Sequence, residues 1–270
     1  MVKSISVNAE KCTHCGMCLK DCIVGVLEFD ENKIPKFIAN GENGCVSCQH
    51  CMAICPTGAL SFGGVNPENL DKATYANSEE LLNLIKSRRS IRHFKKQSVP
   101  KEKLDQIASM LPFAPTGGNR DNLHFSIIQT KEKMDEIIKT SYDEIFKMQN
   151  PSPEFELAKN AFSNGNDIIY RGASSMIAVA IDKSKTIAGC ETADPIIALS
   201  YVDLYAQSIG VGTTWCDYAL MIANKIPKVY SLLDIPDGYT LDYILLLGLP
   251  AVKYKRTIAK PEMFNINFVK

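Results

Sequence analysis

A cysteine run that occurs twice constrains this chain more than any other feature. Ten cysteines occur among the 270 residues, and eight of them form two runs with the same spacing, C-x2-C-x2-C-x3-C. The first run is Cys12, Cys15, Cys18 and Cys22, and the second is Cys45, Cys48, Cys51 and Cys55, which Pro56 follows. Three thiolates at this spacing suit one [4Fe–4S] cluster, while the fourth points towards another. The spacing therefore predicts two clusters.

Zinc and disulfide bonds are the two alternatives for such cysteines. Zinc sites rarely use four cysteines within one short run. Residues Met1 to Lys11 are polar and lack the apolar stretch of a secretory signal, so we expect a cytoplasmic protein whose thiols stay reduced. Both alternatives are therefore disfavoured.

Residues 1–62 resemble the bacterial two-cluster ferredoxins over the whole segment. The resemblance assigns one cluster to Cys12, Cys15, Cys18 and Cys55, and the other to Cys45, Cys48, Cys51 and Cys22. The chain departs from those ferredoxins at Ile23, where proline usually follows the first run, but this change removes no ligand. The resemblance implies single-electron transfer at low potential by a domain that owes its folding to the clusters.

Charge and hydropathy exclude two classes of partner. The chain has 30 basic and 30 acidic residues, so its formal net charge is zero, which argues against a nucleic-acid binder. The longest apolar run, Ile244 to Leu249, is far shorter than the roughly 20 residues that span a bilayer. We therefore expect no nucleic-acid and no membrane partner.

The chain is expected to form two domains. A stretch of turn-forming residues after Phe62 separates a first domain at 1–62 from a second at 78–270, with a linker at 63–77. Apolar spacing predicts helices that begin near Ser78 and Pro100, and a buried helix at Thr192–Ile209. Runs of β-branched residues predict strands at Phe125–Thr130, Met176–Ile181, Val211–Trp215 and Tyr243–Leu247. The second domain is therefore expected to mix α and β structure.

A basic segment follows the first of these helices. It contains Arg88, Arg89, Ser90 and Arg92. Guanidinium groups suit phosphate oxygens, so the segment is a candidate phosphate site, with a solvated basic helix end as the alternative. Small-residue loops occur at 114–119 and 210–215, where glycine permits close approach of the backbone to a ligand. The Gly210-x-Gly212 pair lacks the third glycine of a dinucleotide fingerprint, so no Rossmann domain is expected.

Four segments together resemble the nitroreductase family of FMN enzymes, over about residues 78–270. They are RRSIRHF at 88–94, APTGGN at 114–119, GVGTTW at 210–215, and GLP followed by KYKR at 248–256. The resemblance implies an α+β sandwich domain, an intertwined homodimer, and two FMN molecules in the subunit interface. An FMN-dependent, ferredoxin-fused oxidoreductase is therefore expected.

The same resemblance implies which residues contact FMN. Those for the phosphate and ribityl chain are Arg88, Arg89, Ser90, Arg92, Lys255 and Arg256. Those for the flavin of the other subunit are Pro115, Thr116, Gly117 and Asn119, while Gly210 and Gly212 bring backbone against the isoalloxazine. The tail from Met263 to Lys270 adds a strand to the partner. No catalytic acid or base is assigned.

The expected function is electron transfer from a low-potential donor through both clusters to FMN, and on to a small electrophile such as a nitroaromatic or quinone. The donor is a reduced carrier protein or NAD(P)H. Two alternatives stay open: reduction of an activated C=C or carbon–halogen bond, and an electron-transfer module for a protein partner. Many family members have Gln-Pro-Trp after the position of Asn119, but this chain has Asp121-Asn122-Leu123. The carboxylate of Asp121 either repels anionic substrates or is simply solvated.

Overall fold

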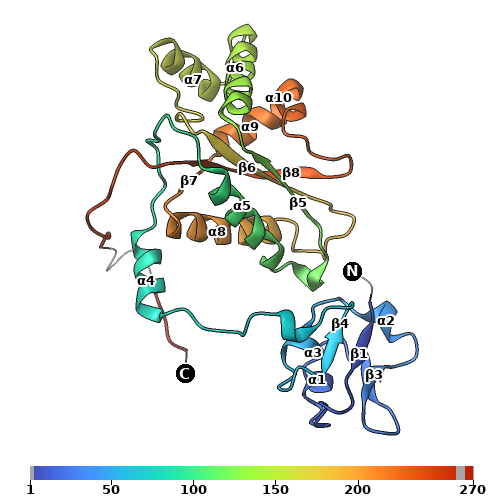
Figure 1. Ribbon diagram of the computed structural model, residues 1–270. Coiled ribbons are helices and arrows are strands. Elements are labelled where there is room, and N and C mark those ends of the chain that lie inside the picture. Colours follow the sequence, from blue (N-terminus) through green and yellow to red (C-terminus); the bar gives the residue numbers. More distant parts are fainter. Residues whose placement is uncertain (1–2, 260–264, 270) are drawn as a thin grey trace. The chain divides into compact units, whose positions relative to one another are not determined.

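The computed structural model describes residues 3–259 and 265–269, which form two compact units (Figure 1). One unit is Met1–Tyr75 with Gly118–Arg120, and the other is Ala76–Gly117 with Asp121–Lys270. The segment expected as a linker, 63–77, belongs to the first unit as far as Tyr75. An ion pair of 2.6 Å between Lys11 Nζ and Glu68 Oε1 ties this segment to the rest of that unit.

The first unit consists of short elements around a small core. In chain order they are β1 (Ile5–Val7), α1 (Met17–Lys20), β2 (Leu27–Phe29), β3 (Pro35–Phe37), α2 (Gly41–Gly44), α3 (His50–Ala53), β4 (Leu60–Phe62) and the 3-10 turn η1 (Pro67–Asn69). Strand β1 pairs antiparallel with β4, and β2 pairs antiparallel with β3. Its core cluster has Cys18, Met52, Leu60 and Phe62 buried, with partly buried apolar residues packed against them. A core this small leaves a unit of this length marginally stable without further links.

The second unit has one four-stranded antiparallel sheet between two layers of helices. Its helices are α4 (Ser78–Ser87), α5 (Lys101–Met110), α6 (Lys131–Lys147), α7 (Pro153–Ser163), α8 (Ala193–Ser208), α9 (Asp217–Lys225) and α10 (Pro227–Ser231), with 3-10 turns η2 (Leu111–Phe113) and η3 (Gly117–Asn119). Its strands are β5 (Leu123–Ile128), β6 (Ser175–Ile181), β7 (Gly212–Trp215) and β8 (Thr240–Gly248). The strand order is β5-β6-β8-β7.

Both faces of this sheet are covered, which explains why all seven residues of β6 are buried. Successive side chains of a strand point to opposite faces. Met176 and Ala178 accordingly join a core with α6, α7, α9 and α10, while Ile177 and Val179 join a second core with α5 and α8. Figure 1 shows these two helix groups on opposite sides of the sheet. The expected mixture of α and β structure is confirmed.

The expected strands and helices are present, with ends that shift by a few residues. The predicted strand at Phe125–Thr130 is β5 at Leu123–Ile128, and the buried helix expected at Thr192–Ile209 is α8. Helix α4 begins at Ser78, but its N-cap is Asn77, whose side chain accepts hydrogen bonds from Glu79 and Glu80 N–H. Asn77 takes this role because its oxygen reaches the free N–H groups of the first turn.

Two further expectations concern the membrane and the tail. Within the described residues, no helix combines the length and apolar character needed to cross a membrane. Of the tail expected to add a strand to a partner, Met263, Phe264 and Lys270 lie outside the described residues. Residues 265–269 contain no strand in this chain, and Ile266 and Phe268 are exposed.

Candidate functional site

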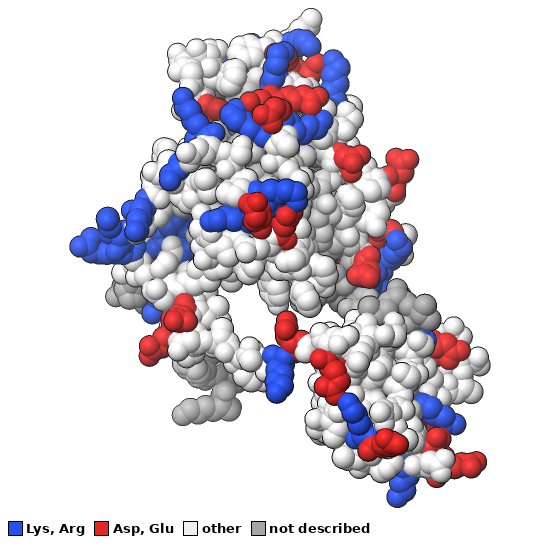
Figure 2. Space-filling view, in the orientation of Figure 1, with Lys and Arg blue, Asp and Glu red and all other residues white. Residues whose placement is uncertain are grey.

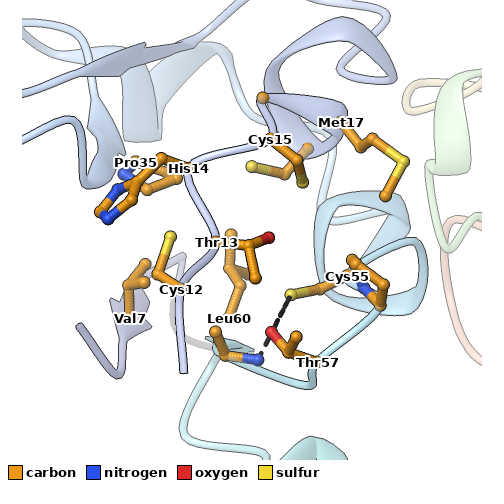
Figure 3. A pocket seen from close by; sticks show the side chains of 14 residues that line it. Val7, Cys12, Thr13, His14, Cys15, Met17, Pro35, Cys55, Thr57 and Leu60 are labelled. Atoms are coloured by element: carbon orange, nitrogen blue, oxygen red, sulfur yellow. Dashed lines mark hydrogen bonds between the residues drawn. The ribbon is translucent and has the colours of Figure 1, made fainter. Parts of the chain in front are cut away.

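The eight cysteines of the two runs line two separate cavities of the first unit. One, of about 340 Å³, is lined by Cys12, Cys15, Cys18 and Cys55. The other, of about 360 Å³, is lined by Cys22, Cys45, Cys48 and Cys51. Each set therefore takes three cysteines from one run and one from the other, the grouping that the ferredoxin resemblance implies. We name them the first and second cysteine sets. Figure 3 shows side chains that line the first cavity.

Backbone in the left-handed region builds both runs in the same way. His14 and Ser47 have φ of 55° and 56°, and they occupy equivalent places in the two runs. Gly16 and Gln49 are also left-handed and precede the short helices α1 and α3. Such residues turn the chain sharply and so bring successive cysteines around one cavity. Repetition of these angles shows that the two runs have one local fold.

Neighbouring N–H groups donate hydrogen bonds to two of the sulfurs. Ala59 N–H donates to Cys55 Sγ at 3.3 Å, and Ser47 N–H donates to Cys45 Sγ at 3.4 Å. In addition, the Thr57 hydroxyl lies 3.8 Å from Cys55 Sγ. Donors of this kind stabilise the negative charge of a thiolate ligand.

The geometry suits a cluster better than a single ion. Among the described residues, no three Cys, His, Asp or Glu side chains gather closely enough to hold one metal ion. A zinc ion binds thiolate at about 2.3 Å and would need its four sulfurs almost in contact. Two cavities lined by four cysteines each instead suit a larger, thiolate-bound group. This disfavours the zinc alternative further.

The environments of the thiols differ between the two sets. In the first set, the N–H of Met17 and then the Thr13 side chain lower the pKa of Cys15. Burial raises the pKa of Cys55, but N–H groups of Leu60, Thr57 and Ala59 outweigh it, and the pKa is lowered. Burial raises the pKa of Cys18. In the second set, burial raises the pKa of Cys51 to about 11.

In the second unit, three of the four predicted flavin segments lie together. Ser90 bridges Thr213 of β7, and Ile91 N–H donates to Thr213 O at 2.8 Å. Phe94 bridges Pro250, just beyond β8. The segment at 88–94 therefore runs beside 210–215 and 248–251, although more than a hundred residues of sequence separate them.

A buried carboxylate that the sequence did not single out holds the start of the basic segment. The Asp203 side chain, 7% exposed, forms an ion pair of 3.3 Å with Arg88 Nη1. It also accepts hydrogen bonds from Gln207, the Thr213 hydroxyl and Trp215 Nε1. The available signal was an acidic residue inside the otherwise apolar stretch at Thr192–Ile209, because such a residue is rarely buried without partners.

Arg89 carries a buried donor that has no partner. Its Nη1 donates to the carbonyls of Lys86 and Arg88, and its backbone N–H donates to Gln207 Oε1 at 3.1 Å. Its Nη2 is buried and makes no hydrogen bond. A buried guanidinium N–H without an acceptor is costly. An anionic ligand group is the acceptor that this side chain suits best, so the segment fits a phosphate.

The loop at 114–119 is fixed at the other end of α8. Gly117 N–H donates at 3.0 Å to Asp194, a buried residue in the first turn of α8, which also accepts from Asn122. Asp203 lies nine positions further along α8, roughly 13 Å at the helical rise per residue. Gly117 and Arg88 are therefore held by two carboxylates at different positions along α8. Asn119 groups with the first unit, with Gly118 and Arg120.

Packing and chain direction explain the glycines of the GVG loop. A Cβ on Gly212 would come within 2.8 Å of Ile91 Cγ1, so glycine lets the basic segment approach β7. Gly210 has φ of 78° and follows α8, which ends in the left-handed turn that glycine favours. The contacts of both residues with a flavin stay predictions.

The remaining candidates are exposed. Arg92, Lys255 and Arg256 are all exposed, and Figure 2 shows basic side chains gathered at the left of the view, where Figure 1 shows the chain beyond β8. Pro115 is exposed, and Thr116 lines an open cavity of about 620 Å³ together with Asp121. Asp121 is itself exposed, which favours the solvated reading of its carboxylate.

Comparison with known proteins finds the same two parts. The nitroreductase family model matches residues 85–249, and the 4Fe-4S dicluster domain model matches residues 11–59. A ferredoxin of Methanocaldococcus jannaschii is 33% identical over 72 residues, which are 27% of this chain and 94% of that protein. The FMN reductase [NAD(P)H] of Bacillus subtilis is 26% identical over 192 residues, 68% of this chain and 70% of that protein.

A solved structure agrees with the sequence matches. The crystal structure of a nitroreductase with bound FMN from Desulfitobacterium hafniense is 27% identical, with a TM-score of 0.57. The match covers 73% of this chain and all of that one, 100%. Both resemblances drawn from the sequence, and the fold class that they imply, are confirmed.

Proposed function

This chain belongs to the nitroreductase family and carries a 4Fe-4S dicluster domain N-terminal to its nitroreductase domain. We therefore propose that it is an FMN-dependent oxidoreductase that receives electrons through two [4Fe–4S] clusters. The observation that carries the proposal is the pair of cavities, each lined by four cysteines, on the same chain as a nitroreductase domain. Clusters supply single electrons, and flavin converts them into the electron pair that a small substrate needs.

The two cysteine sets are the proposed ligands of the clusters. Cys12, Cys15, Cys18 and Cys55 hold one, and Cys22, Cys45, Cys48 and Cys51 hold the other. The N–H groups of Ala59 and Ser47 stabilise ligand charge through their bonds to Cys55 and Cys45. Because the core of this unit is so small, the clusters supply much of its stability.

The basic segment is the proposed phosphate site of FMN. Arg89 offers its unpartnered Nη2, and the ion pair of Arg88 with Asp203 fixes the start of the segment. Ser90, Arg92, Lys255 and Arg256 complete the contacts to the phosphate and ribityl chain. Gly210 and Gly212 approach the ring, and Pro115, Thr116, Gly117 and Asn119 contact the flavin bound to the other subunit.

A homodimer is part of this proposal. Tyr201 and Tyr205 of α8 are exposed, as are Leu81 and Ile85 of α4. Apolar surface of this kind suits an obligate interface.

The proposed donor is a reduced one-electron carrier protein in the cytoplasm, with NAD(P)H as the alternative, and the acceptor is a nitroaromatic or a quinone. To test this, the anaerobically reduced protein is mixed in a stopped-flow instrument with nitroaromatic, quinone and enoate panels. We expect nitroaromatics or quinones to reoxidise the flavin faster than buffer does. Equal rates with every compound would remove the small-molecule function and favour transfer to a protein partner.

Replacement of Arg89 tests the phosphate site. Arg89→Ala is expected to weaken FMN binding by about 10- to 100-fold, because a hydrogen bond to a charged group contributes about 1.5–3 kcal/mol. Arg89→Lys keeps the charge but loses the planar fork, and an intermediate effect is expected. Titration of the apoprotein by FMN fluorescence quenching measures the affinity.

The matched control for Arg89 is Lys101→Ala. Lys101 is exposed and pairs only with Asp105 on its own helix, so its replacement should leave FMN affinity unchanged. If Arg89→Ala bound FMN as tightly as the wild type does, the partner of the buried Nη2 in the wild type would be an anion other than FMN.

A further inference from the structure

Because the two cysteine runs repeat one pattern, the residues that line the two cavities can be compared position by position. The runs share spacing and backbone angles, so each residue of one has an equivalent in the other. Gly25 and Gly58, for example, are equivalent and both have φ of 62°. Differences between equivalent side chains can therefore be compared directly.

At two pairs of equivalent positions, one run has threonine and the other has valine. In both pairs the threonine lines the cavity of the first cysteine set. Thr13 of the first run corresponds to Val46 of the second, and Val24 corresponds to Thr57. The cavity of the first cysteine set is lined by Thr13 and Thr57, and that of the second by Val24 and Val46. Threonine and valine have nearly the same shape but differ by a hydroxyl. Both hydroxyls therefore lie beside one cysteine set.

The Thr57 hydroxyl lies within reach of one of these sulfurs. Its single proton is donated to the carbonyl oxygen of Lys11 at 2.7 Å, and Cys55 Sγ, 3.8 Å from Oγ1, is the second acceptor beside it. A hydroxyl rotates to suit its partners, and a cluster-bound thiolate has no proton of its own to donate. Figure 3 shows Thr13 and Thr57 among the side chains around the same cavity as Cys12, Cys15 and Cys55.

We propose that Thr13 and Thr57 raise the reduction potential of the cluster bound by the first cysteine set above that of the cluster bound by the second set. Reduction adds one negative charge to a cluster, and donors to its sulfurs stabilise that charge. The inference rests on the proposed function, because it takes both cavities to hold clusters. An electron delivered to the second cluster then passes to the first, so that one is reoxidised as the other is reduced.

One other observation agrees with this order. A carboxylate, Asp21, adjoins Cys22 of the second set, 3.3 Å from His50 Nδ1. Negative charge near a cluster disfavours its reduction.

The test is an anaerobic redox titration of the full-length holoprotein, followed by low-temperature EPR. The wild type is expected to show two separate cluster midpoints. In Thr13→Val/Thr57→Val the higher midpoint should fall towards the lower one. In Val24→Thr/Val46→Thr the lower midpoint should rise, because the hydroxyls now serve the second set.

Controls separate hydrogen bonding from packing. Thr13→Ser/Thr57→Ser keeps both hydroxyls and should keep the wild-type midpoints. One shared midpoint in the wild type, or an unchanged higher midpoint in Thr13→Val/Thr57→Val, overturns the proposal. If Thr13→Val/Thr57→Val loses iron, the second variant decides. An unchanged lower midpoint in Val24→Thr/Val46→Thr then overturns the proposal. Absence of iron and acid-labile sulfide from the wild type would instead contradict the proposed function itself.

Discussion

Cys18→Ser is expected to lose the first cluster and to stop electron delivery from a reduced carrier protein. Cys18 is buried in the core of the first unit and lines the first cavity, and a serine hydroxyl is a poor ligand for iron–sulfur clusters. Iron should fall to about four atoms per chain, the content of one [4Fe–4S] cluster. Flavin reduction by the carrier should slow at least about 100-fold. Loss of a residue that only contacts a metal ligand lowers activity by up to about 100-fold, and Cys18 is itself a proposed ligand.

FMN binding is expected to survive this substitution, because the proposed flavin residues lie on other elements. Iron analysis, flavin release and stopped-flow reduction measure the three quantities on the same preparation. Cys190→Ser is the matched control for iron content, since Cys190 lines neither cavity. If FMN were lost along with the iron, the first unit would be a structural support of the flavin site.

Asp203→Ala is expected to destabilise the second unit by about 3 kcal/mol and to weaken FMN binding. Its removal leaves donors of Arg88, Gln207, Thr213 and Trp215 without their acceptor. Loss of one partner of a buried ion pair costs about 3–5 kcal/mol, and the exposed fraction of Arg88, 36%, favours the lower end. The midpoint of thermal unfolding should fall by roughly 6–12 °C.

The control for Asp203 is Asp105→Ala, which breaks the exposed ion pair with Lys101 on α5. Exposed pairs of this type contribute about 0.5 kcal/mol or less, so calorimetry should show almost no change. Equal losses in the two variants would mean that the buried carboxylate is not what anchors the basic segment to β7.

The elements of the second unit could be predicted because their signals are local. Each strand is a short run rich in apolar and β-branched residues, and α8 is a mainly apolar stretch that ends shortly before Gly210. The cysteine sets could be predicted as well, because the resemblance of the two runs to the two-cluster ferredoxins implies which thiols belong together.

The interactions that hold the flavin segments could not be predicted in the same way. Arg88 and Asp203 are far apart in the chain, and nothing local indicates that they pair. Gly212 suggested a flavin contact, but its close neighbour is Ile91, a packing relation that only the tertiary fold reveals. Likewise, nothing local indicates that Gly117 N–H donates to Asp194.

The exchange of one cysteine between the runs has a consequence for biosynthesis. The first set needs Cys55 and the second needs Cys22, so neither set is complete until both runs have left the ribosome. A nascent chain that ends between the two runs holds three thiols of the first set and lacks the fourth, Cys55. Cluster insertion therefore follows synthesis as far as Cys55, and both sites become competent at nearly the same moment.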